Sequence, residues 1–285
     1  MKRERSARLI LSLISVFLLA FSAGLWGVDA QDARAAVTCP VNMTSYWLLD
    51  ETAGATFLDS VGGHDAVCND TTCPDFTAGR VGNALLFNGV DDAVKVPADA
   101  SFNWKLSDSF TIEFWMKTDS TYPCVGNQVM VGRDDSSTDL HWWIGCWDYS
   151  GVAAFRLRDT NGTGVLLFGS TPLNNGQWHH IVAVRNSATG ENSLFVDGRL
   201  EDSIGFNYST GFGSATSPIN IGWLNLAPFY HFAGTLDEIA LYDRAITETE
   251  IRQHYIDGAA NTGYCTDDPP AAPQITSPAV STSYQ

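Results

Sequence analysis

The sequence has 285 residues and a formal net charge of −16 at neutral pH, because 32 Asp and Glu outnumber 16 Lys and Arg. A chain this acidic repels phosphate backbones and anionic lipid surfaces, so we expect neither nucleic acid nor a membrane surface as a partner. Its acidic side chains are instead suited to holding a cation.

The first thirty residues have the layout of a secretory signal peptide. Four basic residues within positions 1–8 precede an apolar run over 9–19 that continues more weakly to Val28. Small residues fit a cleavage site after Ala30 or slightly later. An uncleaved signal anchor is the alternative, since the run approaches the ~20 residues of a membrane span. We therefore expect a secreted or cell-surface protein, with no membrane insertion once residues 1–30 are removed.

Six cysteines remain after the signal peptide, and an even count in an exported chain favours disulfides. One pair lies five residues apart in a turn-rich stretch, and a second pair flanks two expected strands. The last two cysteines then tie the start of the domain to its end. The alternative for the close pair is a zinc site made of His64, Cys68 and Cys73, although an exported chain oxidises such thiols. The predicted bonds are Cys68–Cys73, Cys124–Cys146 and Cys39–Cys265.

The next part of the chain has the pattern of an all-β protein. Segments rich in Val, Ile, Phe, Trp and Tyr recur between clusters of Gly, Asn, Asp and Ser, as in a sandwich or barrel. Residues 110–117 alternate, so we expect one core face and one polar face interrupted by Trp115. Residues 178–185 are apolar on both sides, which predicts a central strand covered on both faces. The Asp197-Gly198 pair predicts a hairpin turn.

A short helix is expected near the C-terminus. Thr247 and Glu250 form a capping box, and the helix runs to about Tyr255 with Gly258 as its stop. Residues 38–265 then make one domain. Residues 266–285 begin with a Pro-rich stretch that predicts an extended linker, followed by a truncated or disordered tail.

Five stretches, taken in order, carry a resemblance to a known family. They are 46–51 with 59–64, 82–92, 110–115, 177–184 with 195–198, and 234–245, the last reading GTLDEIALYDRA. Together they cover about residues 44–256 and resemble the laminin-G-like domains of the concanavalin A-like lectin/glucanase superfamily. The resemblance implies a jelly-roll sandwich of two antiparallel sheets with one short C-terminal helix. It also implies a domain that binds glycans or extracellular proteins, often with a calcium ion.

Asp237 is the most informative carboxylate. On the expected strand 235–242 it shares a side with apolar residues, and a buried carboxylate must be paired or bind a cation. The resemblance adds Asp59, in a Gly-rich turn, as a second calcium ligand. Because calcium takes six to eight oxygens, backbone carbonyls near His64 and one of Asp91 or Asp92 are expected to contribute. The alternative is that Asp237 caps backbone amides and the other acids stabilise turns.

Aromatic residues crowd two segments, 141–149 and 223–231. Aromatic rings offer flat apolar faces to the C–H groups of sugars, and nearby polar groups can bind the hydroxyls. Alternation separates Trp142 from Trp143 and Trp147, so we expect one set in the core and the other exposed. The alternative is that these tryptophans fill the interior. The predicted ligand-binding residues are His141, Trp143, Trp147, Asp135, Trp223 and Tyr230.

We expect no enzymatic activity. Glycoside hydrolases with this jelly roll carry two carboxyls on one face of a strand, whereas adjacent acids such as Asp237 and Glu238 face opposite ways. The sequence has no Gly-x-Ser-x-Gly elbow. It therefore predicts an extracellular, lectin-like carbohydrate-binding module with a structural calcium ion. The alternatives are a protein-binding adhesion module of a cell-surface protein and a non-catalytic accessory domain of a secreted glycoside hydrolase.

Overall fold

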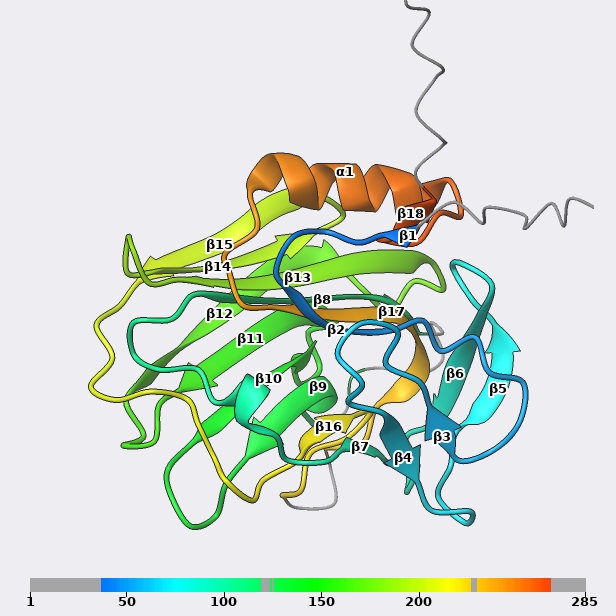
Figure 1. Ribbon diagram of the computed structural model, residues 1–285, viewed down its shortest axis with the longest axis horizontal. Helices are drawn as coiled ribbons and strands as arrows, with labels where there is room; N and C mark the ends of the chain where they lie inside the picture. The colour runs from blue at the N-terminus through cyan, green and yellow to red at the C-terminus, as the bar shows by residue number, and fades with distance from the viewer. Residues whose placement is uncertain (1–36, 119–123, 125, 227–229, 268–285) are drawn as a thin grey trace, which may run out of the picture. The chain divides into compact units, whose positions relative to one another are not determined.

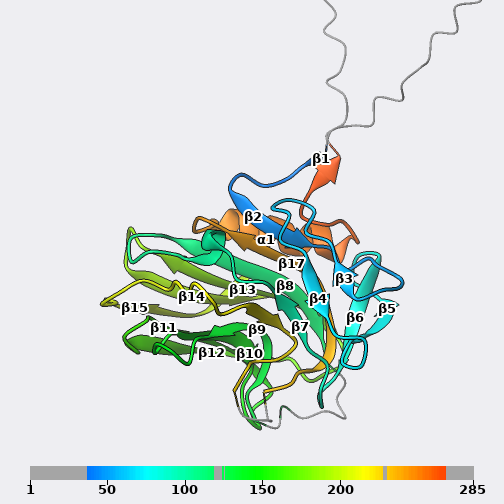
Figure 2. The ribbon, with the colours of Figure 1, turned by 60° about the horizontal axis from the view of Figure 1, so that its bottom comes forward.

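Two antiparallel sheets pack face to face in the computed structural model, which describes residues 37–118, 124, 126–226 and 230–267. Figure 2 shows the two layers, with β9 to β12 below β13 to β15. The predicted signal peptide and residues 268–285 of the predicted tail lie outside the described residues. Within the described part, no helix is long and apolar enough to cross a membrane.

Each sheet has eight strands. Sheet I has the order β15 (Arg199–Gly205), β14 (Glu191–Val196), β13 (Trp178–Asn186), β8 (Phe110–Lys117), β17 (Ala233–Tyr242), β6 (Asn83–Asn88) and β5 (Asp75–Ala78), and β2 (Met43–Trp47) also pairs with β17. Sheet II has the order β12 (Gly164–Pro172), β11 (Val152–Arg158), β10 (His141–Cys146), β9 (Gln128–Asp134), β16 (Ile219–Ile221), β7 (Val94–Val96), β4 (Ala66–Cys68) and β3 (Thr56–Phe57).

The core lies between the two sheets and follows the alternation of the strands. On β8, Phe110, Ile112 and Phe114 point inward, and on β10 the inward residues are Trp142 and Ile144. Every second side chain along these strands points inward, so the two sheets together form one apolar interior. The predicted all-β jelly-roll sandwich is confirmed.

Helix α1 (Glu248–Ala259) covers the outer face of sheet I (Figure 1). The predicted capping box is present, because Thr247 Oγ1 accepts the Glu250 N–H and the Glu250 carboxylate accepts the Thr247 N–H. Ile251 of the helix joins a second cluster of buried residues that includes Trp115 and Val182. Both faces of β13 are therefore buried, as predicted. The outer face of β8 differs from the expectation, since its polar residues Thr111 and Glu113 are also buried.

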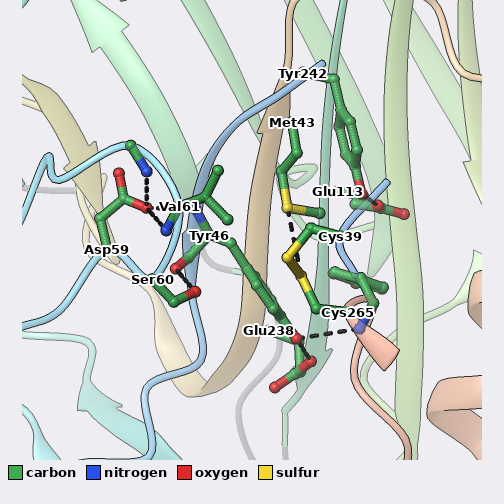
Figure 3. The surroundings of a disulfide bond; sticks show 12 residues. Cys39, Met43, Tyr46, Asp59, Ser60, Val61, Glu113, Glu238, Tyr242 and Cys265 are labelled. Atoms are coloured by element: carbon green, nitrogen blue, oxygen red, sulfur yellow. Dashed lines mark hydrogen bonds between the residues drawn. A yellow bond between two sulfur atoms is a disulfide. The ribbon is translucent and has the colours of Figure 1, made fainter. Parts of the chain in front are cut away.

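All three predicted disulfides are present. Cys39–Cys265 joins positions 226 residues apart, and Figure 3 shows it beside Tyr46 and Glu238. Next to this bond, β1 (Val37–Thr38) pairs with β18 (Thr266–Asp267). The ladder thus extends the predicted 38–265 domain by one residue at its start and two at its end, so the first two residues of the predicted linker form a strand.

Two local elements complete the framework. The β14–β15 hairpin turns at Asp197 and Gly198, which both have positive φ, as the Asp-Gly signal predicts. A short 3-10 helix, η1 (Ala100–Phe102), lies in the connection between β7 and β8, with Asp99 as its N-cap. This connection and the β13–β14 hairpin line one pocket.

Candidate carbohydrate-binding surface

An aromatic cluster lies on the outer face of sheet II. Because side chains alternate along β10, Trp143 points away from the core that holds Trp142. Trp143 stacks on Trp147, with ring centroids 6.3 Å apart and planes 7° apart. Trp147 also packs edge to face with Phe168 from β12, with ring centroids 4.9 Å apart. Tyr230 packs against the same cluster and is partly buried. The structure therefore brings the rings of three predicted residues together in this cluster, namely Trp143, Trp147 and Tyr230.

Trp143 is nevertheless only 2% exposed, so the expectation that its ring faces solvent is wrong. Leu224 packs in the same outer cluster, and Trp147 stacks on the Trp143 ring. A Cβ on Gly132 would lie 2.9 Å from Trp143 Cβ and 3.1 Å from Leu224 Cδ1. The missing side chain at Gly132 thus leaves room for Leu224 over the sheet. Trp143 forms the buried base of the cluster. The accessible rings are those of Trp147, which is half-buried, and of Phe168, which is 40% exposed.

His141 holds Trp143 in place. The indole Nε1 of Trp143 donates to His141 Nε2 at 3.0 Å, and His141 Nδ1 lies 2.9 Å from Asp134 Oδ1. Because Nε2 accepts, Nδ1 carries the proton that is donated to Asp134. Both ring nitrogens are therefore engaged, and His141 positions the buried base of the cluster.

Two arginines stand beside the cluster on β11. Arg156 pairs with Trp143 across the ladder, and Arg158 pairs with His141. Both alternate with core residues of the strand, so both leave the sheet on its outer face. Burial lowers the pKa of Arg156, and the like charge of Arg158 adds to the effect. Sequence reasoning missed Arg156 and Phe168. The alternation of β12, with Val165 and Leu167 in the core, carried the signal for Phe168.

The turn between β10 and β11 is tightly held. Tyr149 is 74% exposed and has a φ of 55°. This is the left-handed region, which residues other than glycine rarely adopt. Its N–H donates to the Cys124 carbonyl at 2.6 Å. Asp148 Oδ1 accepts the Gly126 N–H at 2.8 Å, and Cys124 is bonded to Cys146 at the end of β10. These bonds fix the hairpin tip that follows Trp147.

The two other predicted contact residues lie elsewhere. Trp223 stacks on His231 at 5.8 Å, lies 4.9 Å below Lys95 Nζ, and donates its indole N–H to the Val94 carbonyl. Asp135 is 8% exposed, and its carboxylate accepts hydrogen bonds from the hydroxyls of Ser137 and Ser214. Asp135 therefore stabilises a loop end instead of facing the aromatic cluster.

The acids predicted to bind calcium occupy separate environments. Asp59 accepts the backbone N–H groups of Tyr46, Val61, Gly62 and His64, and Asp91 accepts the side-chain amide of Asn88. In the described part of the chain, no three His, Cys, Asp or Glu side chains form a group that could hold a metal ion. Calcium at Asp59, Asp91 and Asp237 stays a prediction, and backbone carbonyls would have to supply most of its ligands.

Asp237 and Glu238 are the acids whose surroundings best fit a cation. Both are fully buried. Asp237 Oδ2 accepts the N–H groups of Arg80 and Val81 at 2.6 and 3.0 Å, while Oδ1 has no partner among the described residues. Glu238 Oε2 accepts the Tyr46 hydroxyl (Figure 3), and Oε1 is likewise without a partner there. A bound cation would give these two carboxylate oxygens a partner, although calcium needs further oxygen ligands.

Electrostatics support the same conclusion. Burial raises the pKa of Asp237 to about 7, against the effect of its two backbone amides. Burial and the neighbouring Asp237 charge raise the pKa of Glu238 to about 9, and the charge of Asp50 contributes to both. Glu238 also has a φ of 53° where the pairing of β17 with β8 shifts register. Strain of this kind is found at functional positions. A calcium ion here would supply the missing positive charge.

Two antiparallel sheets that pack face to face define the class of the protein, a jelly-roll sandwich. The family model of the concanavalin A-like lectin/glucanases superfamily (Laminin_G_3) matches residues 88–252. The chain belongs to this laminin-G-like family, as the resemblance predicts. A search of the curated proteins found no match.

Solved structures share the fold. The binding domain of Paraclostridial Mosquitocidal Protein 1 is 18% identical, with a TM-score of 0.61 over 75% of this chain and 52% of that one. Domain 4 of AbnA, an extracellular arabinanase from Geobacillus stearothermophilus in complex with arabinotriose, is 18% identical, with a TM-score of 0.55 over 74% and 97%. A Trypanosoma rangeli sialidase is 18% identical, with a TM-score of 0.56 over 81% and 37%. The chain spans about half the length of the toxin binding domains it matches.

Proposed function

We propose that this protein is an extracellular carbohydrate-binding module without catalytic activity. The observation that carries the proposal is the Trp147 platform, which comprises Trp147 and Phe168 on the outer face of sheet II. The parallel stack of Trp147 on buried Trp143 fixes the ring. A fixed aromatic face loses little conformational entropy when it binds the apolar face of a sugar.

The polar neighbours of the platform suit a hydroxylated ligand. Arg156 stands on the adjacent strand of the same face, paired with Trp143, and a guanidinium offers five N–H donors. The AbnA domain, whose structure contains arabinotriose, is matched over 97% of its length. This match supports a glycan as the ligand. The adjacent acids Asp237 and Glu238 are fully buried, which supports binding without hydrolysis.

The extracellular location rests on two observations. All six cysteines are paired in disulfides, which persist in oxidising compartments. The first thirty residues also have the signal-peptide layout described above. The protein is therefore proposed to be secreted or displayed on a cell surface.

The module is also proposed to hold a structural calcium ion at Asp237 and Glu238. Calcium would compensate two carboxylates whose charged forms burial disfavours. The test is thermal unfolding at pH 8 with calcium and with chelator. Wild type should unfold at a higher temperature with calcium. The isosteric Asp237→Asn variant, which keeps an oxygen for the Arg80 and Val81 amides, should show no difference. Equal melting temperatures of the wild type in both buffers contradict the site.

The glycan proposal is tested with a glycan array, run with calcium and again with chelator. Trp147→Ala should raise the dissociation constant of any glycan found by at least tenfold, which is a loss of about 1.4 kcal/mol of binding free energy. Trp178→Ala is the matched control, because Trp178 is another half-buried tryptophan but lies on sheet I. It should bind like the wild type. The proposal fails if Trp147→Ala folds and binds unchanged, or if the array detects no glycan.

A further inference from the structure

A second basic group, the side chain of Arg185, lies at the end of the sandwich and has a donor without a partner among the described residues. Arg185 is the penultimate residue of β13 and is 4% exposed. Its guanidinium carbon lies 4.9 Å from the centre of the Tyr208 ring. Its one hydrogen bond in the described structure is a long one, 3.4 Å from Nη1 to the Asn186 carbonyl, and Nε has no partner there. Burial lowers the pKa of Arg185, yet a guanidinium stays protonated in proteins.

Arg133 shows how the same fold satisfies a buried guanidinium that has a structural role. It is fully buried, and its Nε, Nη1 and Nη2 donate to the carbonyls of Ser217, Phe102 and Ser214 at 2.7 to 3.0 Å. Arg185 has no such set of acceptors, and no carboxylate lies within 4 Å of it among the described residues. A buried charge that has no ion-pair partner and few hydrogen bonds destabilises a protein. Arg185 thus carries donors that the protein itself leaves unused.

These donors border a pocket. Arg185 lines a cavity of about 380 Å³ together with Leu106, Thr189, Asn207 and Tyr208. Ser187 belongs both to this cavity and to a larger neighbouring one of about 760 Å³. The larger cavity is lined by hydroxyl, amide and carboxylate groups, including those of Ser109, Asn186 and Asp243. A cation and a polar recess that can bind hydroxyls therefore lie side by side.

We propose that Arg185 binds the oxyanion, a carboxylate or a sulfate, of an acidic sugar whose hydroxyls enter the larger pocket. The planar guanidinium fork matches two oxygens of either group. The acidity of the chain does not prevent this, because charges farther away than about 8 Å are largely screened at physiological ionic strength. The site goes beyond the proposed function, since it shares no residue with the Trp147 platform.

The experiment titrates the full chain with sodium glucuronate and with sodium sulfate. Calorimetry measures affinity, and thermal unfolding measures stability. Glucose and sodium chloride at matched ionic strength are the controls, because sulfate stabilises many proteins without specific binding. We expect saturable binding of at least one anion and none of glucose alone at equal concentration. Response to glucuronate identifies the carboxylate, and response to sulfate identifies the sulfate ester as the group recognised.

Arg185→Met keeps the length of the side chain and removes its charge, so it should weaken anion binding at least tenfold. Its melting temperature in the absence of ligand should equal or exceed that of the wild type, because a buried unpaired charge is removed. Arg252→Met, an exposed arginine on α1, is the matched control and should bind like the wild type. If Arg185→Met does not fold, Arg185→Lys retains the charge without the fork and should bind at least threefold more weakly.

The proposal is overturned if neither anion gives saturable binding, or if a folded Arg185 variant binds as tightly as the wild type. Trp147→Ala separates the two sites, since it should lose the glycan found on the array and keep the anion response. Failure of the oxyanion site therefore leaves the glycan platform untouched, and the reverse also holds.

Discussion

Glu113 organises the buried contact between sheet I and α1, and its replacement by glutamine should destabilise the protein strongly. The carboxylate is fully buried. It contacts His180 Nε2 from β13 at 3.1 Å, His254 Nδ1 from α1 at 3.0 Å, and accepts the Tyr242 hydroxyl from β17. Tyr264 packs against the same group, and its ring centroid lies 5.2 Å from that of His254. Glutamine keeps the shape of the side chain and removes the charge that pairs with histidine.

The magnitude follows from the pKa of Glu113. Burial alone would raise it, but His254 and His180 outweigh burial and hold it at about 2, against an ordinary 4.5. At 1.36 kcal/mol per pH unit, the ionised form stabilises the fold by about 3 kcal/mol. For a domain of this size, this corresponds to a melting temperature lowered by roughly 6 to 12 °C. Breaking a buried ion pair typically costs a similar amount.

The effect should depend on pH within a defined window. The depressed pKa of Glu113 contributes stability that is present above 4.5 and lost as pH falls through about 2. The Glu113 charge raises the pKa of His254 above 6.5 against the opposing effect of burial. That contribution is complete below 6.5 and is lost as pH rises through the folded value. The difference between wild type and Glu113→Gln should therefore be largest between about pH 4.5 and 6.5.

Urea unfolding followed by near-UV circular dichroism from pH 3 to pH 9 measures this difference. The control is Glu248→Gln, an exposed glutamate at the start of α1, which should change the free energy of unfolding by less than about 1 kcal/mol. A Glu113→Gln effect below about 1 kcal/mol at pH 5.5, or one that is constant across the pH range, refutes the ion-pair argument.

Two further predictions concern the framework. Replacing Cys39 and Cys265 with serine opens a loop of 226 residues. By the chain-entropy argument, urea unfolding should show that the free energy of unfolding falls by up to about 5 kcal/mol. An unchanged unfolding midpoint contradicts this prediction. Gly258→Ala should lower the free energy of unfolding by roughly 1 to 3 kcal/mol, because its Cβ would meet Trp115 Cζ2 and Nε1 at 2.5 Å. Gly205→Ala, where a Cβ meets no atom within 4 Å, should cost less than about 1 kcal/mol, and equal effects of the two alanines would disprove the packing argument.

Local patterns predicted the framework because local physics creates it. The Asp197-Gly198 turn depends on the φ preferences of two residues, and the capping box depends on Thr247 and Glu250, three positions apart. The disulfides followed from spacing and from the exported character of the chain. Apolar residues on both sides of β13 required a cover on each face, and α1 supplies the outer one.

The candidate site was predicted in part only, because its exposure is decided by residues distant in sequence. The alternation of β10 correctly placed Trp142 and Trp143 on opposite faces. It did not show that Leu224, about 80 positions later, packs in the same outer cluster as Trp143. Phe168 and Arg156 belong to neighbouring strands of the sheet. The contact of Phe168 with Trp147 and the pairing of Arg156 with Trp143 depend on the β10–β11–β12 register. Strand order of this kind is a property of the whole fold.

The partners of the buried acids are also decided by residues distant in sequence, and these partners indicate where a cation would bind. Asp59 has four backbone N–H donors, which outweigh burial and lower its pKa. Glu113 has two histidines, which also outweigh burial. Asp237 has two amides from residues more than 150 positions away, and its pKa is still raised to about 7. Glu238 has one tyrosine hydroxyl, and its pKa is raised to about 9. The first two carboxylates are stable as anions without a metal. Of these four carboxylates, Asp237 and Glu238 lack sufficient donors, so we expect a cation bound at these two residues to stabilise the fold more than one bound at Asp59 or Glu113.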